Sequence, residues 1–225
     1  MLYVVPTPLG NLKDITERAK EQLATCDFII AENPSTTRKL LQLLKLPPKS
    51  PKLEIVQFAD HNEQKVLHTY LDRLEKQDAC LVSDAGTPGV SDPGFRLVRS
   101  ARERGIQVSA LPGANAVTTA LSASGLPTDR FLFVGFFPKT EFKVIEYINL
   151  AKITTATLIA YESPQRIIKT MGYIANNFPE ANVVIARELT KIHEEYISGI
   201  PSEIVNILRT KKSIKGEITL LLSFK

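Results

Sequence analysis

Cysteines and metal-ligand spacings are scarce in this sequence. Its 225 residues include two cysteines, Cys26 and Cys80, in apolar or helix-end contexts. Isolated cysteines of this kind are usually buried, reduced thiols. His61 and His68 are seven residues apart and could share a helix face, but neither has a cysteine or carboxylate at a known ligand spacing. We therefore expect reduced thiols and no metal site.

Long apolar runs are also missing. No stretch approaches the ~20 residues that a membrane-spanning helix needs. The N-terminus, residues 1–6, has no basic segment and too short an apolar run for a signal peptide. No low-complexity tract or internal repeat stands out. We expect a cytoplasmic protein with no membrane segment.

Neither sign of charge dominates the chain. The formal net charge is +4 and the isoelectric point is near 9.0. This mild excess permits a polyanionic partner without demonstrating one. The densest basic run is Lys211–Lys215, and as a solvated loop it needs no function.

The most informative segment is the loop Ser83–Gly94, which contains three glycines and two prolines. It follows the apolar run Ala79–Val82 and precedes a helical pattern, an order that in α/β proteins brings backbone N–H groups against a ligand. Phe95 and Arg96 stand where a P-loop requires Lys and Ser or Thr, and no G-x-G-x-x-G opens a helix near the N-terminus. We predict a ligand cradle that is neither an ATP clamp nor the usual dinucleotide site.

The first half alternates apolar runs with amphipathic segments, which predicts a mostly parallel sheet covered on both faces. Asp14 is the predicted cap of the first helix, and the second is expected to end at Pro47-Pro48. The predicted strands are Leu2–Val5, Phe28–Ala31, Leu53–Phe58, Ala79–Ser83 and Gln107–Leu111. The predicted helices are Asp14–Thr25, Thr37–Leu44, Asn62–Leu74 and one that ends near Arg104.

The second half contains strands with no helix between them near residues 182–198, which predicts a mixed sheet with antiparallel pairs. The predicted strands are Phe131–Phe136, Thr155–Tyr161, Asn182–Arg187, Glu195–Ser198 and Glu217–Ser223. The predicted helices are a small-residue helix to about Ser124, then Glu141–Lys152, Pro164–Asn176 and Ser202–Lys211. We therefore expect an α/β protein of two α/β subdomains, residues 1–113 and 114–225.

Three loops fall at the carboxyl ends of predicted strands: Pro6–Leu12, Asp84–Gly94 and Pro112–Ala116. Ligands of open α/β sheets bind at that edge. Tyr161–Pro164 and Arg187–Thr190 end two strands of the second half and are candidates for an opposite wall. We expect the ligand to bind in a cleft between the two subdomains.

Taken together, these five segments resemble the tetrapyrrole methylase superfamily of class III S-adenosylmethionine-dependent methyltransferases. The last of them reads Ala186–Glu195, ARELTKIHEE. More narrowly, the chain resembles the ribosomal RNA branch of that superfamily, the RsmI family of 16S rRNA cytidine 2′-O-ribose methyltransferases. The resemblance covers essentially the whole chain.

This resemblance implies S-adenosylmethionine as the methyl donor, bound in a cleft between two α/β halves, and a homodimer. It also implies small-subunit rRNA as a partner. The positions that match cofactor contacts of the family are Pro8, Ala85, Gly86, Thr87, Val90, Asn115, Ala116, Glu162 and Glu188. Small residues at several of these positions would let the backbone approach the cofactor.

The sequence departs from the RsmI pattern in three places. An acidic residue and an arginine are usual after the second strand, where this chain has Asn33-Pro34-Ser35. The stretch Lys139–Lys143 is mixed in charge rather than strongly basic. Many relatives continue beyond the position of Lys225. Each departure removes a feature that could hold RNA, so a small-molecule acceptor such as a tetrapyrrole, or a non-catalytic S-adenosylmethionine-binding module, stays open.

Methyl transfer to a ribose hydroxyl would be helped by a base or a polarising cation. The candidates are Glu32, Glu63, Arg187 and Glu188, which lie near predicted loop or strand ends. The alternative for each one alone is a structural ion pair or a helix cap, and for Glu63 the position at a helix start already favours an acid. The base therefore stays unassigned from sequence.

Overall fold

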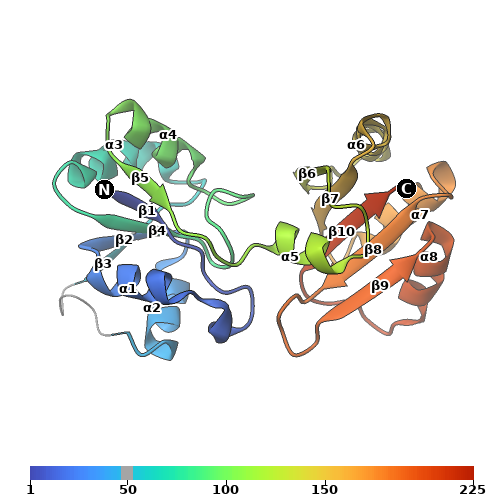
Figure 1. Ribbon diagram of the computed structural model, residues 1–225, viewed down its shortest axis with the longest axis horizontal. Helices are drawn as coiled ribbons and strands as arrows, with labels where there is room; N and C mark the ends of the chain where they lie inside the picture. The colour runs from blue at the N-terminus through green and yellow to red at the C-terminus, as the bar shows by residue number, and fades with distance from the viewer. Residues whose placement is uncertain (47–52) are drawn as a thin grey trace. The chain divides into compact units, whose positions relative to one another are not determined.

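The computed structural model describes residues 1–46 and 53–225. These residues form two compact units, Met1–Asn115 and Ala116–Lys225, which we call unit 1 and unit 2. Each unit contains one five-stranded sheet with helices packed on it (Figure 1). The predicted fold class, two α/β sheets of which one is parallel and one mixed, is confirmed.

The sheet of unit 1 is entirely parallel, in the order β3-β2-β4-β1-β5. Its strands are short and rich in Val, Ile, Leu and Ala, as expected for parallel strands buried on both faces. They are β1 (Leu2–Val4), β2 (Phe28–Ala31), β3 (Glu54–Gln57), β4 (Ala79–Val82) and β5 (Val108–Ala110).

Helices cover both faces of this sheet (Figure 1). They are α1 (Glu17–Thr25), α2 (Pro34–Leu43), α3 (Glu63–Leu74) and α4 (Phe95–Glu103), with a 3₁₀ turn, η1 (Leu12–Asp14), before α1. Alternate strand residues enter different cores: Ile30 packs with side chains of α3 and α4, whereas Ile29 packs with those of α1. The parallel sheet is thus buried from both sides.

The sheet of unit 2 is mixed, in the order β6-β7-β10-β8-β9. Its strands are β6 (Phe131–Phe136), β7 (Thr157–Glu162), β8 (Asn182–Arg187), β9 (Glu195–Gly199) and β10 (Ile218–Ser223). Only β6 and β7 run parallel; β10 is antiparallel to both β7 and β8, and β9 is antiparallel to β8. The predicted antiparallel pair of β8 and β9 is therefore confirmed.

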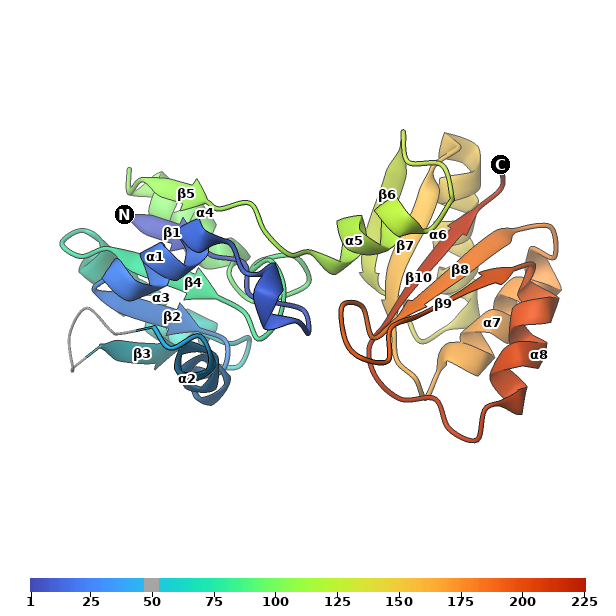
Figure 2. The same cartoon turned by 60° about the horizontal axis from the view of Figure 1, so that its bottom comes forward.

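The helices of unit 2 lie on opposite faces of its sheet. They are α5 (Ala116–Ala123), α6 (Glu141–Thr154), α7 (Ile167–Asn177) and α8 (Pro201–Thr210). Side chains of α6, α7 and α8 share one core with the sheet, whereas α5 packs on β7 and β10 from the other side (Figure 2). Among the described residues, no helix has the length and apolar character needed to cross a membrane.

Three predicted helix starts are wrong, those of α1, α2 and α7. Helix α7 begins at Ile167 rather than Pro164, because residues 164–166 form a turn before it. Asp14 ends the 3₁₀ turn instead of capping α1; the hydroxyl of Thr16 accepts from the Ala19 N–H at 3.1 Å and is the N-cap. Helix α2 begins at Pro34 rather than Thr37, because the Asn33 side chain caps it and proline fits the first helical position. The expected helix end at Pro47-Pro48 lies outside the described residues.

Candidate functional site

The three loops predicted at the carboxyl edge of unit 1 lie together in the structure. Thr7 and Gly86 form a two-way backbone bridge, each N–H donating to the other's carbonyl at 2.9 Å. The Thr7 hydroxyl also donates to the Ser83 carbonyl at 3.2 Å. The Thr87 hydroxyl donates to the Ala114 carbonyl at 2.9 Å, which ties in the third loop. The loops after β1, β4 and β5 thus form one continuous surface.

This surface lies at the topological switch point of the sheet, where the connections from two neighbouring strands lead to opposite sides. Strands β1 and β4 are neighbours in the sheet, yet α1 packs on one face and α4 on the other. Ligands of open α/β sheets bind outside the carboxyl ends of the strands at such a point. The glycine-rich loop therefore stands at the position in unit 1 where this fold class places a ligand.

Glycines let the backbone pack closely here. Gly94 has φ +135°, and a Cβ on it would lie 2.9 Å from a methyl group of Leu81. A Cβ on Gly113 would lie 2.7 Å from Pro6, so the first and third loops touch at a residue with no side chain. Ser91 has φ +63°, an uncommon conformation for a non-glycine residue. Neither Gly94 nor Gly113 can gain a side chain without moving a neighbour.

Three carboxylates gather beside the glycine-rich loop. Glu32, just after β2, accepts from the Asp84 N–H at 3.2 Å. Burial raises the pKa of Asp84, and the negative charge of Glu32 adds to this, while a hydrogen bond with Thr36 opposes it. Burial raises the pKa of Asp92 to about 6, with a hydrogen bond to Ser83 opposing and the charges of Glu32 and Asp84 adding. Asp92 thus titrates nearer neutrality than an ordinary aspartate.

Glu63 has a structural setting. It is the first residue of α3, is buried, and accepts from the guanidinium of Arg96 at 3.4 Å. An acid in the first helical turn is stabilised by the helix dipole as well. These contacts account for an acid at this position without a catalytic role.

In unit 2, Glu162 holds the turn after β7. Its carboxylate is fully buried and accepts from Nε and Nη2 of Arg166 at 2.8 and 2.5 Å, and from the Thr170 hydroxyl at 2.6 Å. The Ser163 N–H donates to the same group at 2.6 Å. Arg166 also donates to the Phe137 carbonyl, which links this turn to the end of β6. The Glu162 side chain is therefore committed to positioning its own loop.

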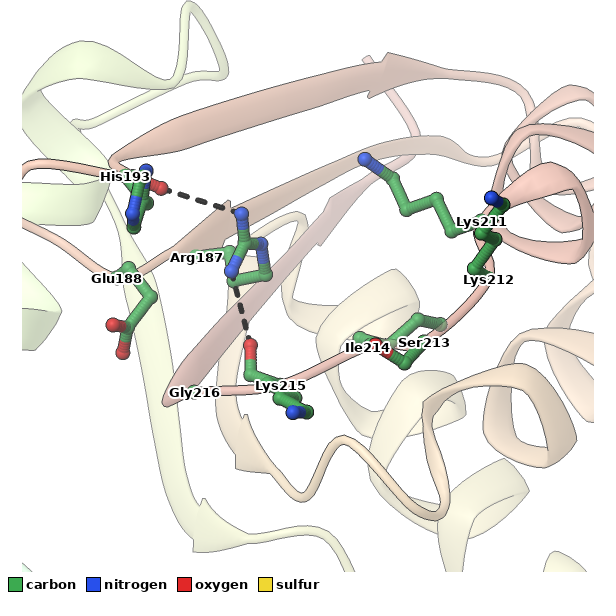
Figure 3. Close-up of a pocket in the computed structure, with 9 residues that line it drawn as sticks. All are labelled: Arg187, Glu188, His193, Lys211, Lys212, Ser213, Ile214, Lys215 and Gly216. Carbon is green, nitrogen blue, oxygen red and sulfur yellow. Dashed lines mark hydrogen bonds between the residues drawn. The ribbon is translucent and has the colours of Figure 1, made fainter.

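Arg187 and Glu188, at the end of β8, line a cavity in unit 2 (Figure 3). Arg187 donates from Nε to Glu195 at 3.0 Å. Glu188 pairs with Lys191 at 2.8 Å and accepts from the Glu217 N–H at 3.0 Å. These two hydrogen bonds, the one from Lys191 being the stronger, lower the pKa of Glu188. Glu188 is thus a weak proton acceptor near neutrality, and Arg187 is a fixed cation.

The turn after β8 is strained, which sequence reasoning missed. Glu188 and Thr190 have φ values of +54° and +64°, and for the β-branched Thr190 this is a true outlier. Thr190 Oγ1 is also a buried side-chain polar atom with no hydrogen-bond partner among the described residues. Strain and an unsatisfied hydroxyl tend to occur at functional sites. The sequence motif Ala186–Glu195 identified the segment, but nothing in it singled out Thr190.

The predicted site residues divide between the two units. Pro8, Ala85, Gly86, Thr87, Val90 and Asn115 lie on or beside the joined loops of unit 1, whereas Ala116, Glu162 and Glu188 belong to unit 2. Asp92 was not predicted, because its burial and its charged neighbours depend on tertiary structure. No group of three or more His, Cys, Asp or Glu side chains that could hold a metal ion occurs in the described part of the chain.

The sequence of residues 1–204 matches the model of the tetrapyrrole (corrin/porphyrin) methylase family. The chain belongs to this family. It is 42% identical over 99% of its length to the ribosomal RNA small subunit methyltransferase I of Hydrogenobaculum, of which it covers 95%. It is 43% identical over 98% of its length to the protein of the same name from Escherichia coli O157:H7, of which it covers 76%.

These similarities place the chain in the ribosomal RNA small subunit methyltransferase I branch of the methylase family, as the motifs predicted. The Thermotoga maritima member is 38% identical, and the alignment covers 100% of this chain and 98% of that one. The prediction that the chain is a methyltransferase is confirmed.

Solved structures agree on the fold. The structure of a diphthine synthase superposes with a TM-score of 0.77 over 99% of this chain and 89% of that one, at 14% identity. A cobalt precorrin-4 methyltransferase of cobalamin biosynthesis gives 0.69, covering 99% and 94%, at 20% identity. Identities this low show the shared architecture alone.

Proposed function

We propose that this methyltransferase transfers a methyl group from S-adenosylmethionine to the 2′-hydroxyl of a cytidine in small-subunit (16S) rRNA. The observation that carries the proposal is 42% identity over nearly the whole chain to a protein named for small-subunit rRNA methylation. The nearly full-length match covers the loops of both units. Acting on ribosomal RNA, the enzyme would work in the cytoplasm.

The cofactor supplies an electrophilic methyl group on a sulfonium ion. In unit 1, Pro8, Ala85, Gly86, Thr87 and Val90 would hold it, mostly through their backbone. Supporting this assignment, Gly89 has φ +81° and open space around it, so the loop presents main chain rather than side chains. Backbone N–H and C=O groups suit the polar ribose and zwitterionic tail of such a ligand.

The remaining proposed contacts are Asn115, Ala116, Glu162 and Glu188. Asn115 and Ala116 lie on the segment where unit 1 passes into unit 2. Because the carboxylate of Glu162 is fully hydrogen bonded within its own turn, its contribution would come through the backbone it positions. The charge of Glu188 is already paired with Lys191. Asn115 carries a side-chain amide, which can both donate to and accept from a polar ligand.

For the proton of the ribose hydroxyl, we favour the carboxylates beside the glycine-rich loop over Glu63 or Glu188. A general base works best when its pKa lies near the working pH. Asp92, with a pKa of about 6, meets this condition, and Glu32 lies close enough to raise that pKa. Arg187 is then a candidate for holding substrate charge rather than for proton transfer.

We further propose that the enzyme is a homodimer and that α6 contributes to the interface. Helix α6 buries one face and leaves Phe142 and Ile153 about 80% exposed, at 78% and 81%. With Leu150 and Tyr147, these side chains line a shallow groove of about 440 Å³. Large apolar side chains that gather on one exposed surface are typical of an interaction site, and the family resemblance implies a second copy of the chain as the partner.

The activity is tested with small ribosomal subunits from cells that lack the enzyme and with methyl-labelled S-adenosylmethionine. We expect label to enter 16S rRNA and to be recovered as 2′-O-methylcytidine. Label in a small tetrapyrrole but not in RNA would assign the alternative acceptor. Binding of the cofactor with no transfer to any acceptor would indicate a non-catalytic module.

A further inference from the structure

We propose that the cavity between Arg187 and the Lys211–Lys215 loop of unit 2 binds a backbone phosphate of the RNA substrate. The proposal rests on the proposed function, because it requires the acceptor to be RNA. The cavity has a volume of about 480 Å³, within the range of roughly 300–1,000 Å³ that is usual for ligand sites. It can hold a phosphodiester with an adjoining sugar.

The basic loop is held in place at both ends. At its start, Lys211 Nζ pairs with Glu195 Oε1 at 2.5 Å; near its end, the Lys215 carbonyl accepts from Arg187 at 3.0 Å. Between them, Ile214 packs against the core of unit 2. A loop already ordered in this way loses little conformational freedom when a ligand binds. It differs in this respect from a freely solvated lysine run.

Arg187 is fixed in an orientation that leaves donors available. One of its five N–H groups donates to the Glu195 carboxylate at 3.0 Å. Two others donate to the carbonyls of Lys215 and His193, at 3.0 and 3.3 Å (Figure 3). One N–H on each terminal nitrogen remains. A planar guanidinium held by its other contacts is well suited to donate to phosphate oxygens.

The charge of the lining favours an anion. One arginine, three lysines, one histidine and one carboxylate line the cavity. That carboxylate, Glu188, is paired with Lys191, and Glu195 behind the lining is shared by Arg187 and Lys211. Lys212 and Lys215 are exposed and have no ion-pair partner among the described residues. Their two positive charges are therefore available for a polyanion, and RNA binding releases counterions in proportion to such contacts.

The test compares the full-length enzyme with the double variant Lys212→Ala/Lys215→Ala. Binding to naked 16S rRNA is measured over a range of salt concentrations. We expect the slope of log K against log salt to fall by roughly 1, since the loss of one phosphate contact removes about 0.7–0.9. We also expect KM for small subunits to rise about tenfold with little change in kcat, and Lys212→Arg/Lys215→Arg to keep the slope of the unmodified enzyme.

The matched control is Lys76→Ala/Lys169→Ala, which removes two exposed lysines elsewhere. Thermal melting and calorimetric binding of S-adenosylmethionine check that each variant is folded. A salt slope unchanged in the test variant, or lowered equally in the control, overturns the phosphate site. So does a defect seen with assembled subunits but absent with naked RNA, which would point to an acidic ribosomal protein. If the unmodified enzyme neither binds nor methylates the RNA, the proposed function is wrong, and the phosphate site is rejected with it.

Discussion

Gly216 lies so close to Glu188 that a Cβ on the glycine would overlap the Glu188 carboxyl group. The adjacent Glu217 N–H donates to the same carboxylate at 3.0 Å, and Gly216 itself has φ +91°. The start of β10 is thereby fixed against the end of β8. This contact forms one wall of the basic cavity.

We expect Gly216→Ala to lower the free energy of unfolding by about 2–4 kcal/mol, because the methyl group must displace Glu188 and the backbone angle is unfavourable for alanine. Urea denaturation measures the change. Gly105→Ala is the control: its φ is +72°, but nothing lies within 4 Å of the new Cβ, so only the backbone cost of about 1–2 kcal/mol applies. Equal losses in the two variants would show that the contact with Glu188 is unimportant.

Asp92 should make stability depend on pH. Its pKa is raised from 3.8 to about 6, so the folded state binds the proton more tightly than the unfolded state does. The stability this contributes is fully present below pH 4 and is lost as the pH rises through 6. We expect Asp92→Asn to be more stable than the unmodified enzyme at pH 7, on the order of 1 kcal/mol after allowance for partial exposure, and the gain to vanish below pH 4.

Urea midpoints between pH 3.5 and 8 measure this dependence, and Asp60→Asn controls for the loss of one exposed negative charge. If Asp92 is also the base, the Asn variant should lose about 10²–10⁴ in kcat. The unmodified enzyme should lose activity as the pH falls through 6. An Asp92→Asn enzyme with full activity would return the role to Glu32 or another group.

The Glu162–Arg166 pair should be sensitive to removal of one partner. The Glu162 carboxylate is fully buried, so Arg166→Met leaves an uncompensated charge and should cost about 3–5 kcal/mol. Glu162→Gln/Arg166→Met removes that charge and should recover part of the loss. Chemical denaturation of both variants provides the comparison. A double variant no more stable than Arg166→Met would contradict the charge-burial explanation.

The exposed face of α6 should control assembly. We expect Phe142→Glu/Ile153→Glu to shift the enzyme from dimer to monomer in light scattering, because two carboxylates would be buried in the interface. Ile207→Glu, on the exposed side of α8, should leave the dimer intact. A double variant that remains dimeric would exclude α6 from the interface.

Strand and helix positions could largely be predicted from sequence because they depend on local patterns. The apolar runs predicted each strand that the structure describes, and errors occurred at helix starts. Asp14 and Thr16 are both good capping residues two positions apart, and only the structure shows that Asn11 starts a separate turn before Thr16 caps α1. When two capping residues lie this close together, the residue types alone do not show which of them begins the helix.

The sequence predicted which loops form the candidate site, but not all of the residues that matter within them. The Ser83–Gly94 loop and the turn after β8 were both identified, yet Asp92 and Thr190 were not. The pKa of Asp92 depends on burial and on Glu32, which is 60 residues away in sequence. The strain at Thr190 is a backbone angle with no sequence signature. The sequence showed the basic run Lys211–Lys215, but not its contacts with Glu195 and Arg187, which depend on the tertiary structure.

The central claim, methylation of a small-subunit cytidine, is tested most directly by mass spectrometry of 16S rRNA nucleosides from cells with and without the gene. We predict that deletion removes one 2′-O-methylcytidine and that the restored gene returns it. A methylation map that is identical in the two strains would contradict the claim.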